Sequence, residues 1–375
     1  MNKQLISEKL LAQSDKILFI THLAIGDYTY MQTYFKALSQ AYPHIKIDLW
    51  IDELRRTWCF WRWESLKKYS LYDWVENCSF FRKIYKKTYS PFALSNSVRE
   101  AQKEKYPIVV FMGGLRPHNY ADLARSIAPQ GFIVGVQQPV SKFNFLYKKS
   151  YKKFDAVVDT RRNPEEIHIT DTYAGLFKQI FGIYVDPVAR APFVDIPQKW
   201  VSYAKFQFLK RGIDKKNKNF GKVFFINPFA KNKKRCWPIE HVVELIMQIK
   251  QDDQWQDISF IVNVVPEEFD NVNTYLKKRS VNDVFLFTAS TNFFQLPAMI
   301  SCCDLIISVE TATIHLASAL HVPVVALMRQ KNPEWAPWDT KNSHIVTTGK
   351  RSHWIKDIPV VSIVHAVKKF SQNYF

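Results

Sequence analysis

Short runs of apolar residues alternate along the chain with longer segments in which apolar residues recur at helical spacing. Short, continuous apolar runs between helical segments are typical of parallel strands that helices cover on both faces. The pattern therefore predicts an α/β protein built from strand–helix units. In the first half of the chain the predicted strands are residues 16–22, 46–51, 108–112 and 132–136.

The alternation is clearest in the second half of the chain. There the predicted strands are residues 223–227, 258–262, 284–287, 304–308 and 322–327. The predicted helices between and after them are residues 239–250, 266–278, 294–302 and 311–320. In the first half, a predicted loop at 23–27 leads into a helix that runs to about Gln40, and a helical pattern over 163–182 ends at Gly182, a common helix stop.

A segment of different character, residues 186–221, separates the two halves. Three prolines (Pro187, Pro192 and Pro197) precede a basic run there. Prolines interrupt regular structure, so we predict that this segment is the connection between two domains together with the lead-in to the second one. A length of 375 residues also suits about two domains. The expected boundaries are 1–190 and 191–357 for the two domains, with 358–375 as a C-terminal helix that packs back toward the first domain.

A net charge of +18 adds an expectation about partners. An excess of this size attracts nucleic acid, anionic membrane surfaces or phosphorylated small molecules. The basic residues gather in residues 55–87, 142–162 and 231–235, and aromatic residues interleave the first two clusters. Basic and aromatic residues together suit a membrane interface or single-stranded nucleic acid. For any single cluster, a solvated surface is the simpler interpretation.

Cysteine usage and the N-terminal residues favour a cytoplasmic protein. The five cysteines form no C-x-x-C pair and no Cys/His metal spacing, which indicates free thiols in a reducing compartment. Residues 1–16 carry several charges and lack the apolar centre of a signal peptide. No stretch of about 20 apolar residues predicts a membrane span.

Candidate chemistry lies in the loops that follow the strands, because ligands of open α/β sheets bind beyond the carboxyl ends of the strands. The first candidate is the pair Gly26-Asp27, after the first predicted strand. A carboxylate there can act as a general base toward a hydroxyl group. The alternative is that Asp27 only caps the helix that follows.

The second candidate is the polar, basic loop after strand 223–227. It contains Asn227, Lys231 and Arg235 and leads through Trp237-Pro238 into a helix. Backbone amides, a helix dipole and basic side chains converge in such a loop, which predicts a phosphate site, although an exposed basic turn has the same composition. The chain has no G-x-x-x-x-G-K-[ST] motif, which disfavours a P-loop nucleotidase.

The third candidate is residues 308–315, with the sequence SVETATIH, which follow a strand and open a helix. Helix N-terminal amides and the hydroxyls of Thr311 and Thr313 predict a second anion site. Glu310 can orient a sugar or ribose hydroxyl. His315 lies one turn into the helix, where a histidine packs in the core more often than it reacts.

The order of these motifs in the second half resembles family 9 of the glycosyltransferases, the lipopolysaccharide heptosyltransferases. The family has a phosphate loop with a basic residue and then Trp-Pro before a helix, which residues 227–230, Arg235 and Trp237-Pro238 match. Its Asp-Thr-Gly-x-x-His-x-Ala-Ala motif is matched by ETATIHLAS at 310–318, and its proline-containing strand by 322–327.

The first half is similar to the family in one place, where a strand is followed by Gly26-Asp27 and a helix. The resemblance covers residues 16–40 and 223–340. It implies an α/β protein of the GT-B fold, in which two Rossmann-like domains face a central cleft. The acceptor would bind mainly to the first domain and the donor to the second.

The resemblance also implies roles for individual residues. Asp27 would be the general base, Arg235 would stand where the family has a donor-phosphate lysine, Glu267 or Glu268 would lie near the nucleoside, and Thr311 would hold the diphosphate. The candidate donor-binding residues are Asn227, Lys231, Arg235, Glu267, Glu268, Glu310, Thr311, Ala312, Thr313 and His315. The candidate acceptor-binding residues are Gly26, Arg55, Arg56, Arg62, Gly113 and Arg116.

The activity that the resemblance implies is inverting transfer of heptose from ADP-heptose to the inner core of lipopolysaccharide or lipooligosaccharide. The expected partners are a nucleotide sugar, an anionic glycolipid acceptor and the inner membrane surface, without nucleic acid. No metal or cofactor is expected, because basic side chains can neutralise the departing diphosphate. The enzyme would be cytoplasmic and peripheral to the inner membrane.

Three departures from the family pattern concern the donor. Glu310 replaces aspartate, Ala312 replaces glycine, and Pro228-Phe229 replaces a threonine pair. These changes leave open another nucleotide sugar, a protein acceptor, or a non-catalytic protein that binds sugar or nucleic acid.

Overall fold

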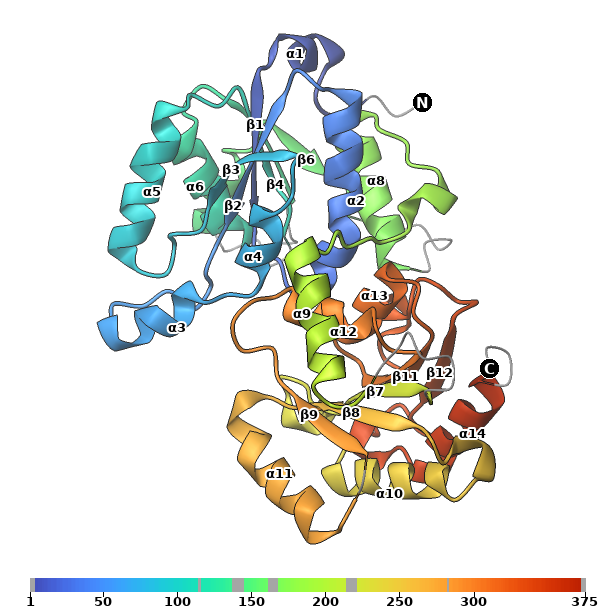
Figure 1. Cartoon of the computed structure of the whole chain (residues 1–375). Helices are drawn as coiled ribbons and strands as arrows, with labels where there is room; N and C mark the ends of the chain where they lie inside the picture. The colour runs from blue at the N-terminus through green and yellow to red at the C-terminus, as the bar shows by residue number, and fades with distance from the viewer. Residues whose placement is uncertain are drawn as a thin grey trace. The chain divides into compact units, whose positions relative to one another are not determined.

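Two parallel six-stranded sheets, one in each half of the chain, form the framework of the protein in the computed structural model (Figure 1). The chain divides into two units, Met1–Arg190 and Ala191–Phe375. The structure describes residues 4–113, 116–136, 145–160, 168–213, 221–281 and 283–371. Residues 163–167 of the predicted helical segment lie outside the described residues, as do residues 142–144 and 161–162 of one basic cluster and residues 214–220 of the basic run after Pro197.

The first sheet has the strand order β3-β2-β1-β4-β5-β6, with every pair parallel. Its strands are β1 (Lys16–Thr21), β2 (Lys46–Ile51), β3 (Phe81–Tyr85), β4 (Ile108–Phe111), β5 (Phe132–Val136) and β6 (Ala156–Val158). From β1 to β3 the strands are added on one side of β1, and from β4 to β6 they are added on its other side, so the switch point lies between β1 and β4. Loops on either side of such a switch point diverge and leave a crevice at the carboxyl edge.

The second sheet repeats this order as β12-β11-β10-β7-β8-β9, again with parallel pairs. Its strands are β7 (Val223–Asn227), β8 (Ser259–Asn263), β9 (Val284–Phe287), β10 (Leu305–Val309), β11 (Val324–Met328) and β12 (Ser343–Thr347). The switch point lies between β7 and β10. Both units therefore have the strand order of a dinucleotide-binding Rossmann fold.

Helices cover the first sheet and close an aromatic core. They are α1 (Glu8–Gln13), α2 (Ile25–Ala41), α3 (Trp63–Lys67), α4 (Leu71–Glu76), α5 (Pro91–Lys103), α6 (Pro117–Ile127), α7 (Phe145–Tyr151) and α8 (Ile169–Phe181). Phe19 of β1 packs edge to face on Phe35 of α2 and stacks on Phe177 of α8, at ring-centroid distances of 4.9 and 6.2 Å. Helix α8 ends at Gly182, whose positive φ of 71° suits glycine.

The second sheet is covered by α9 (Gln198–Leu209), α10 (Ile239–Lys250), α11 (Phe269–Lys278), α12 (Gln295–Ile300), α13 (Ala312–Ala319) and α14 (Val360–Ser371). Buried residues of α14, among them Ile363 and Val367, share the core of this unit with Val243 of α10. The buried Trp237 indole donates a hydrogen bond to the Ile358 carbonyl oxygen (3.0 Å). This face of α14 therefore belongs to the second unit, and its predicted return to the first domain stays a prediction.

Helix α9, which lies within residues 186–221, was not predicted from the sequence. The proline that precedes it, Pro197, is the N-cap residue and starts the helix instead of breaking it. Ala204 and Phe208, four residues apart, are buried and place α9 against α12.

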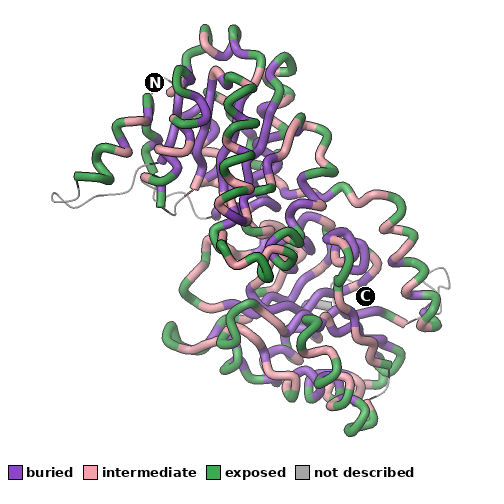
Figure 2. The backbone as a smooth tube through the Cα atoms, turned by 90° about the vertical axis from the view of Figure 1, so that its left-hand side faces the viewer, coloured by how far each residue is buried: buried purple, intermediate pink, exposed green. Residues whose placement is uncertain are grey.

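The strands β3, β6 and β12 were not predicted, and all three lie at sheet edges. These three strands are partly exposed and lack the continuous apolar run that identifies an interior strand. The fourth edge strand, β9, has such a run and was predicted. Figure 2 shows buried positions along the strands of both units and exposed positions on the outer faces of the helices. None of the helices in the described part of the chain has the length and apolar character needed to cross a membrane.

Candidate functional site

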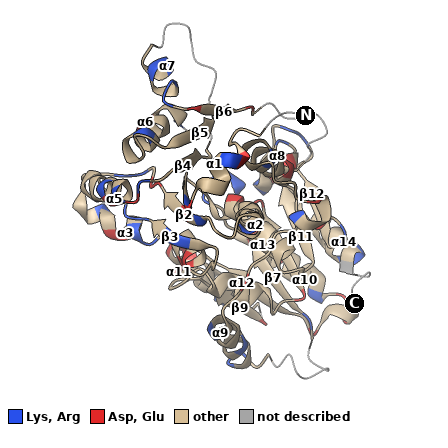
Figure 3. Cartoon of the chain, turned by 90° about the horizontal axis from the view of Figure 1, so that it is seen from above, with Lys and Arg blue, Asp and Glu red and all other residues tan. Residues whose placement is uncertain are grey.

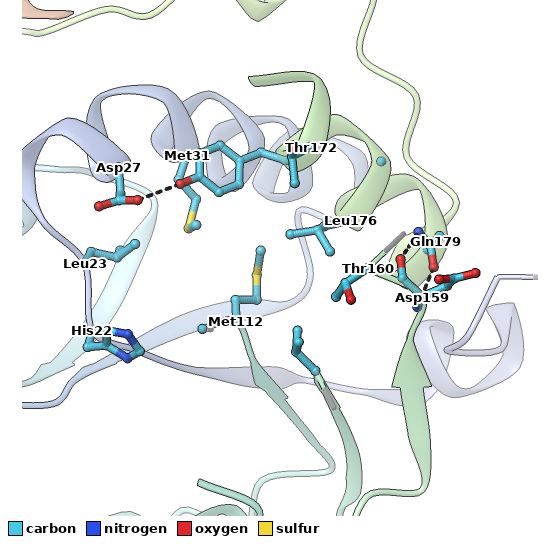
Figure 4. Close-up of a pocket in the computed structure, with 14 residues that line it drawn as sticks. His22, Leu23, Asp27, Met31, Met112, Asp159, Thr160, Thr172, Leu176 and Gln179 are labelled. Atoms are coloured by element: carbon cyan, nitrogen blue, oxygen red, sulfur yellow. Dashed lines mark hydrogen bonds between the residues drawn. The ribbon is translucent and has the colours of Figure 1, made fainter. Parts of the chain in front are cut away.

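A pocket of about 240 Å³ lies at the switch point of the first sheet, beyond the carboxyl ends of β1 and β4 (Figure 4). His22 and Asp27 follow β1, and Met112 and Gly113 follow β4. Tyr173 reaches the pocket from α8. The pocket thus combines ionisable groups with an apolar wall, as sites for small polar ligands commonly do.

Asp27 lies in the first turn of α2 and not in the loop that the sequence predicted, because the helix begins earlier, at Ile25. Its Oδ2 atom accepts a hydrogen bond from the Ala24 backbone N–H (3.3 Å), which caps the helix. Its Oδ1 atom accepts one from the Tyr173 hydroxyl (2.9 Å). The two interpretations of Asp27, general base and helix cap, are therefore compatible, since the carboxylate that caps the helix also lines the pocket.

Burial raises the pKa of Asp27, and the hydrogen bonds from Tyr173 and Ala24 and the nearby His22 act in the opposite direction. Desolvation disfavours the charged form, while donors directed at the carboxylate favour it. A carboxyl whose pKa is raised is a stronger base when ionised. Burial and the adjacent Asp27 raise the pKa of Tyr173 well above its usual value, so its hydroxyl stays protonated and remains a donor.

His22 provides a second polar group in the pocket. Its Nδ1 atom is buried and has no hydrogen-bond partner among the described residues, and the Thr172 hydroxyl has the same status. Burial lowers the pKa of His22, against the opposing influence of Asp27 and Asp52. Buried polar atoms without partners are rare, and both residues line the pocket.

Gly113 keeps this part of the pocket open. A Cβ atom at this position would stand 2.8 Å from Cε1 of His22 and 2.9 Å from the Phe111 ring. Any side chain at position 113 would therefore displace His22. Gly26, the other predicted glycine, lies in the first turn of α2 beside Asp27.

A smaller pocket of about 160 Å³ in the same unit brings together Arg56 and Arg116, two of the predicted acceptor-binding residues. Asp52, which also lines it, pairs with the Arg56 guanidinium and accepts a hydrogen bond from the Tyr120 hydroxyl (2.8 Å). Arg116 has a left-handed backbone (φ 50°) and precedes α6. The negative charge of Asp52 partly neutralises this pocket.

The two other predicted arginines lie apart from both pockets. Arg55 forms a two-pronged ion pair with the buried Glu53, with nitrogen–oxygen distances of 2.8 and 2.6 Å. Arg62 is exposed in the short helix η1 (Phe60–Arg62). The structure therefore brings Asp27 and Gly113 together around one pocket, to which Gly26 does not contribute, and Arg56 and Arg116 around another.

The switch point of the second sheet is organised by Asn227, the last residue of β7. Its buried amide donates to the hydroxyls of Ser308 (3.0 Å) and Thr311 (2.9 Å), and its oxygen accepts from the Asn263 amide (2.8 Å). This network fixes the carboxyl ends of β7, β8 and β10 relative to one another. Thr311 in turn caps α13 by accepting from the Thr313 backbone N–H (3.4 Å).

Glu310 directly precedes this cap, and both oxygens of its buried carboxylate accept hydrogen bonds from other residues of the protein. Its Oε1 atom accepts from Arg235 Nη2 (2.9 Å) and from the Asn332 amide (2.7 Å). Its Oε2 atom accepts from the Arg329 backbone N–H (3.3 Å) and lies 3.6 Å from Arg329 Nε. Glu310 thus anchors two arginines, and this arrangement leaves it little capacity to orient a sugar hydroxyl.

The anchored arginines form a cationic group at the carboxyl edge of the sheet. The guanidinium of Arg329 lies over the Trp354 ring at 5.0 Å, and the Lys234 ammonium lies 5.3 Å from the same ring. The Nε atoms of Arg235 and Arg329 are buried without a hydrogen-bond partner among the described residues. Guanidinium groups that are fixed in this way suit phosphate oxygens.

The remaining predicted donor residues do not all join this group. Ala312 starts α13 beside the cap, and Thr313 and His315 are buried in that helix. Lys231 is exposed in the loop after β7, Glu267 is exposed in the short helix η5 (Pro266–Glu268), and Glu268 accepts from the Asn271 amide (3.1 Å). Within the described residues, no three His, Cys, Asp or Glu side chains gather as metal ligands would.

The sequence reasoning missed His22, Tyr173, Arg329 and Asn332. His22 and Arg329 directly follow β1 and β11, so the rule that selected Asp27 could have found both. Tyr173 lies 146 residues from Asp27 and gives no sequence signal for this contact.

The chain is similar to known proteins both in sequence and in structure. The model of the family described as "Glycosyltransferase family 9 (heptosyltransferase)" matches residues 140–356. A curated protein of Escherichia coli (strain K12) with the provisional name lipopolysaccharide heptosyltransferase 4 is 24% identical over 157 residues. That alignment spans 40% of this chain and 40% of the relative.

Solved structures share the two-unit architecture over nearly the whole chain. A family 9 glycosyltransferase from Veillonella parvula has a TM-score of 0.72 at 15% identity and covers 100% of this chain and 99% of its own. E. coli ADP-heptose lipopolysaccharide heptosyltransferase II has a TM-score of 0.66 at 15% identity, with 96% and 99% covered. The E. coli heptosyltransferase WaaC, solved with ADP, has a TM-score of 0.65 at 14% identity, with 95% and 99% covered. The predicted two-domain GT-B fold is confirmed.

Proposed function

The chain belongs to glycosyltransferase family 9, and from this premise we propose that it is an inverting glycosyltransferase. The proposed reaction moves a sugar from a nucleotide sugar to a hydroxyl group of an anionic glycolipid. The observation that carries this proposal is the position of Asp27, held by Tyr173 and Ala24 in a pocket at the switch point of the first sheet.

In the proposed mechanism the first unit binds the acceptor and activates it. An acceptor hydroxyl in the pocket donates its proton to the Asp27 carboxylate as its oxygen attacks the anomeric carbon from the face opposite the leaving group. His22 and Thr172, which also line the pocket, would orient other acceptor hydroxyls. General-base assistance of this kind contributes about 10²–10⁴-fold to a rate.

The second unit would hold the donor and stabilise the departing nucleoside diphosphate. The Arg235 and Arg329 guanidiniums and the N-terminal amides of α13 supply positive charge that is already oriented when the bond breaks. Preorganised charge of this kind lowers the barrier without reorganisation. We infer that these groups take the place of a metal ion, and that no cofactor beyond the nucleotide sugar is needed.

The proposed donor is ADP-heptose and the proposed acceptor is the inner core of lipopolysaccharide or lipooligosaccharide. The support is family membership together with two structural neighbours, ADP-heptose lipopolysaccharide heptosyltransferase II and the WaaC structure with ADP. Reaction at the cytoplasmic face of the inner membrane, by a peripherally bound enzyme, follows from that acceptor. The Glu310 and Ala312 departures make the donor the first part to test.

A thermal-shift series with ADP, UDP and GDP tests the donor class. A ligand at 100 times its dissociation constant stabilises the folded state by about 2.7 kcal/mol. We expect ADP to raise the unfolding temperature more than UDP or GDP at equal concentration. A larger shift with UDP or GDP would reject the ADP-linked donor and leave the transferase assignment intact.

Tyr173→Phe tests how Asp27 is tuned. Loss of the hydroxyl removes a donor that stabilises the carboxylate, so the pKa of Asp27 rises further. Because the base acts in its ionised form, the acidic limb of the kcat/KM–pH profile should move up by about one pH unit. At pH values above this limb, activity should approach that of the wild type.

The matched control is Tyr34→Phe, which removes a buried hydroxyl that donates to the Thr170 carbonyl oxygen (2.6 Å) and does not contact Asp27. Its acidic limb should coincide with that of the wild type. An equal displacement in both variants would assign the effect to general loosening of α2 and α8.

A further inference from the structure

Three large aromatic side chains stand exposed within four residues of the first unit. Trp58 is 72% exposed, Phe60 is 69% exposed and Trp61 is 70% exposed. They belong to residues 54–68, which include η1 and α3 and which we call the aromatic arm. Solvation of so much aromatic surface is unfavourable, and contiguous exposed apolar surface commonly marks an interaction site.

The base of the aromatic arm is fixed to the body of the unit. The Thr57 N–H donates to the Tyr89 carbonyl oxygen (3.1 Å), and the Trp63 indole donates to the Thr57 carbonyl oxygen (3.0 Å). Arg56 Nε donates to the Thr88 carbonyl oxygen (2.8 Å), and Leu66 is buried. The arm thus turns some of its apolar groups inward while the three aromatic side chains stay in solvent. Figure 1 shows α3 standing out from the sheet and helices of its own unit.

The charge of the aromatic arm is positive. Glu64 is its single acidic residue, against the basic residues Arg55, Arg56, Arg62, Lys67 and Lys68. Arg55 and Arg56 pair with Glu53 and Asp52 just before the arm, and Lys67 pairs with Glu64. Arg62, which follows Trp61 directly in the sequence, and Lys68 are both exposed.

A second surface of similar character lies at the same edge of the sheet. Helix α7 follows β5 and exposes Phe145 (73%) and Leu146 (76%) next to Lys148 and Lys149. The arm follows β2, and parallel strands end at the same edge. Figure 3 shows basic residues on α7 and near α3. The strands that precede the two surfaces, β2 and β5, therefore end at the edge of the sheet that carries the pocket around Asp27.

We propose that the aromatic arm docks the protein on an anionic phospholipid bilayer, with Trp58, Phe60 and Trp61 inserted at the headgroup level. Tryptophan favours this region because its ring is apolar and its N–H is polar, and nearby basic residues are attracted to anionic lipid. The proposal rests on the proposed function only in its purpose, which is to bring the pocket edge to a lipid-linked acceptor.

The test is sedimentation of the full-length protein with two kinds of vesicle, phosphatidylcholine alone and phosphatidylcholine mixed with phosphatidylglycerol. We expect binding to the mixed vesicles, weakened by salt. The triple variant W58S/F60S/W61S should bind them at least about tenfold more weakly, because interfacial binding scales with buried apolar area. The control Y184S/V188S removes side chains of the same unit that are 65% and 86% exposed, and it should bind like the wild type.

Equal binding of the triple variant and the wild type would overturn the proposal, as would equal binding to both kinds of vesicle. The proposal would also be overturned if the wild type did not bind vesicles but instead formed a dimer, or a complex with plain RNA, that the triple variant did not form. Unfolding temperatures of all variants check that the fold is intact. Transfer to a lipid-free acceptor fragment should be unchanged in the triple variant, so a failure of docking and a failure of the transferase assignment are distinguishable.

Discussion

Asp27→Asn should lower the turnover number about a thousandfold, because the amide cannot accept the proton of the acceptor hydroxyl. The substitution is isosteric, and the new side chain retains one oxygen for Tyr173 or for the Ala24 N–H. The loss of charge in the first turn of α2 should cost less than about 1 kcal/mol of folding stability. Nucleotide binding, which we assign to the second unit, should be unchanged. Steady-state kinetics and nucleotide titration measure the two quantities separately.

The chain offers a matched control in Asp171, which occupies the same N3 position in α8 and accepts from the His168 backbone N–H (3.0 Å). It does not line the pocket around Asp27. Asp171→Asn should keep near-normal turnover and lose more stability than Asp27→Asn, because it also loses the ion pair with Arg190. If the two variants lost activity to the same degree, capping would be the whole role of Asp27 and the base would have to be sought elsewhere.

Glu310→Gln should produce the largest loss of stability among single changes at the candidate sites. Glu310 is 4% exposed, and its carboxylate holds Arg235, Arg329 and Asn332. Removing one partner of a buried ion pair leaves the other charges uncompensated, which costs about 3 kcal/mol. The free energy of unfolding from denaturant titration of the full-length protein is the measurement. The guanidinium groups of Arg235 and Arg329 should also become less ordered in this variant.

Two further variants separate the effect of the negative charge of Glu310 from the effect of its side-chain length and position. Glu310→Asp restores the residue type that the family has at this position and keeps the charge, so it should lose less stability than Glu310→Gln. Glu244→Gln alters an exposed residue of α10 and should stay within about 0.5 kcal/mol of the wild type. Equal stability of Glu310→Gln and the wild type would show that the arginines find other partners, and Glu310 would then be free to contact a donor.

The interior strands of both sheets could be predicted from the sequence because burial on both faces leaves a continuous apolar run. Among the interior strands, β2, β5 and β7 have the predicted bounds, and β1 and β4 end one residue earlier than predicted. The edge strand β9 also has the predicted bounds, because its residues form an apolar run. The edge strands β3, β6 and β12 escaped because their partial exposure breaks that run. Helix α9 was not predicted because the prolines of residues 186–221 indicated a connecting segment, although Pro197 starts the helix.

Part of the candidate site could also be predicted, for a topological reason. Parallel strands end at one edge, so residues that directly follow a strand gather there whatever their separation in sequence. Asp27, Asn227, Arg235 and Thr311 were found in this way. The rule gives the edge of the sheet but not the direction of a side chain, and so it could not show that the Glu310 carboxylate is occupied by protein groups.

The sequence by itself determined the two α/β units, the family and the loops that hold the candidate chemistry, because apolar periodicity and short motifs are local properties. The tertiary structure alone decided which polar groups meet. Tyr173 contacts Asp27 across 146 residues, and Arg235 reaches Glu310 across 75. These contacts depend on helix packing and side-chain direction, which no local pattern encodes. The basic and aromatic character of residues 55–87 was visible in the sequence, but only the folded chain shows that Trp58, Phe60 and Trp61 remain in solvent.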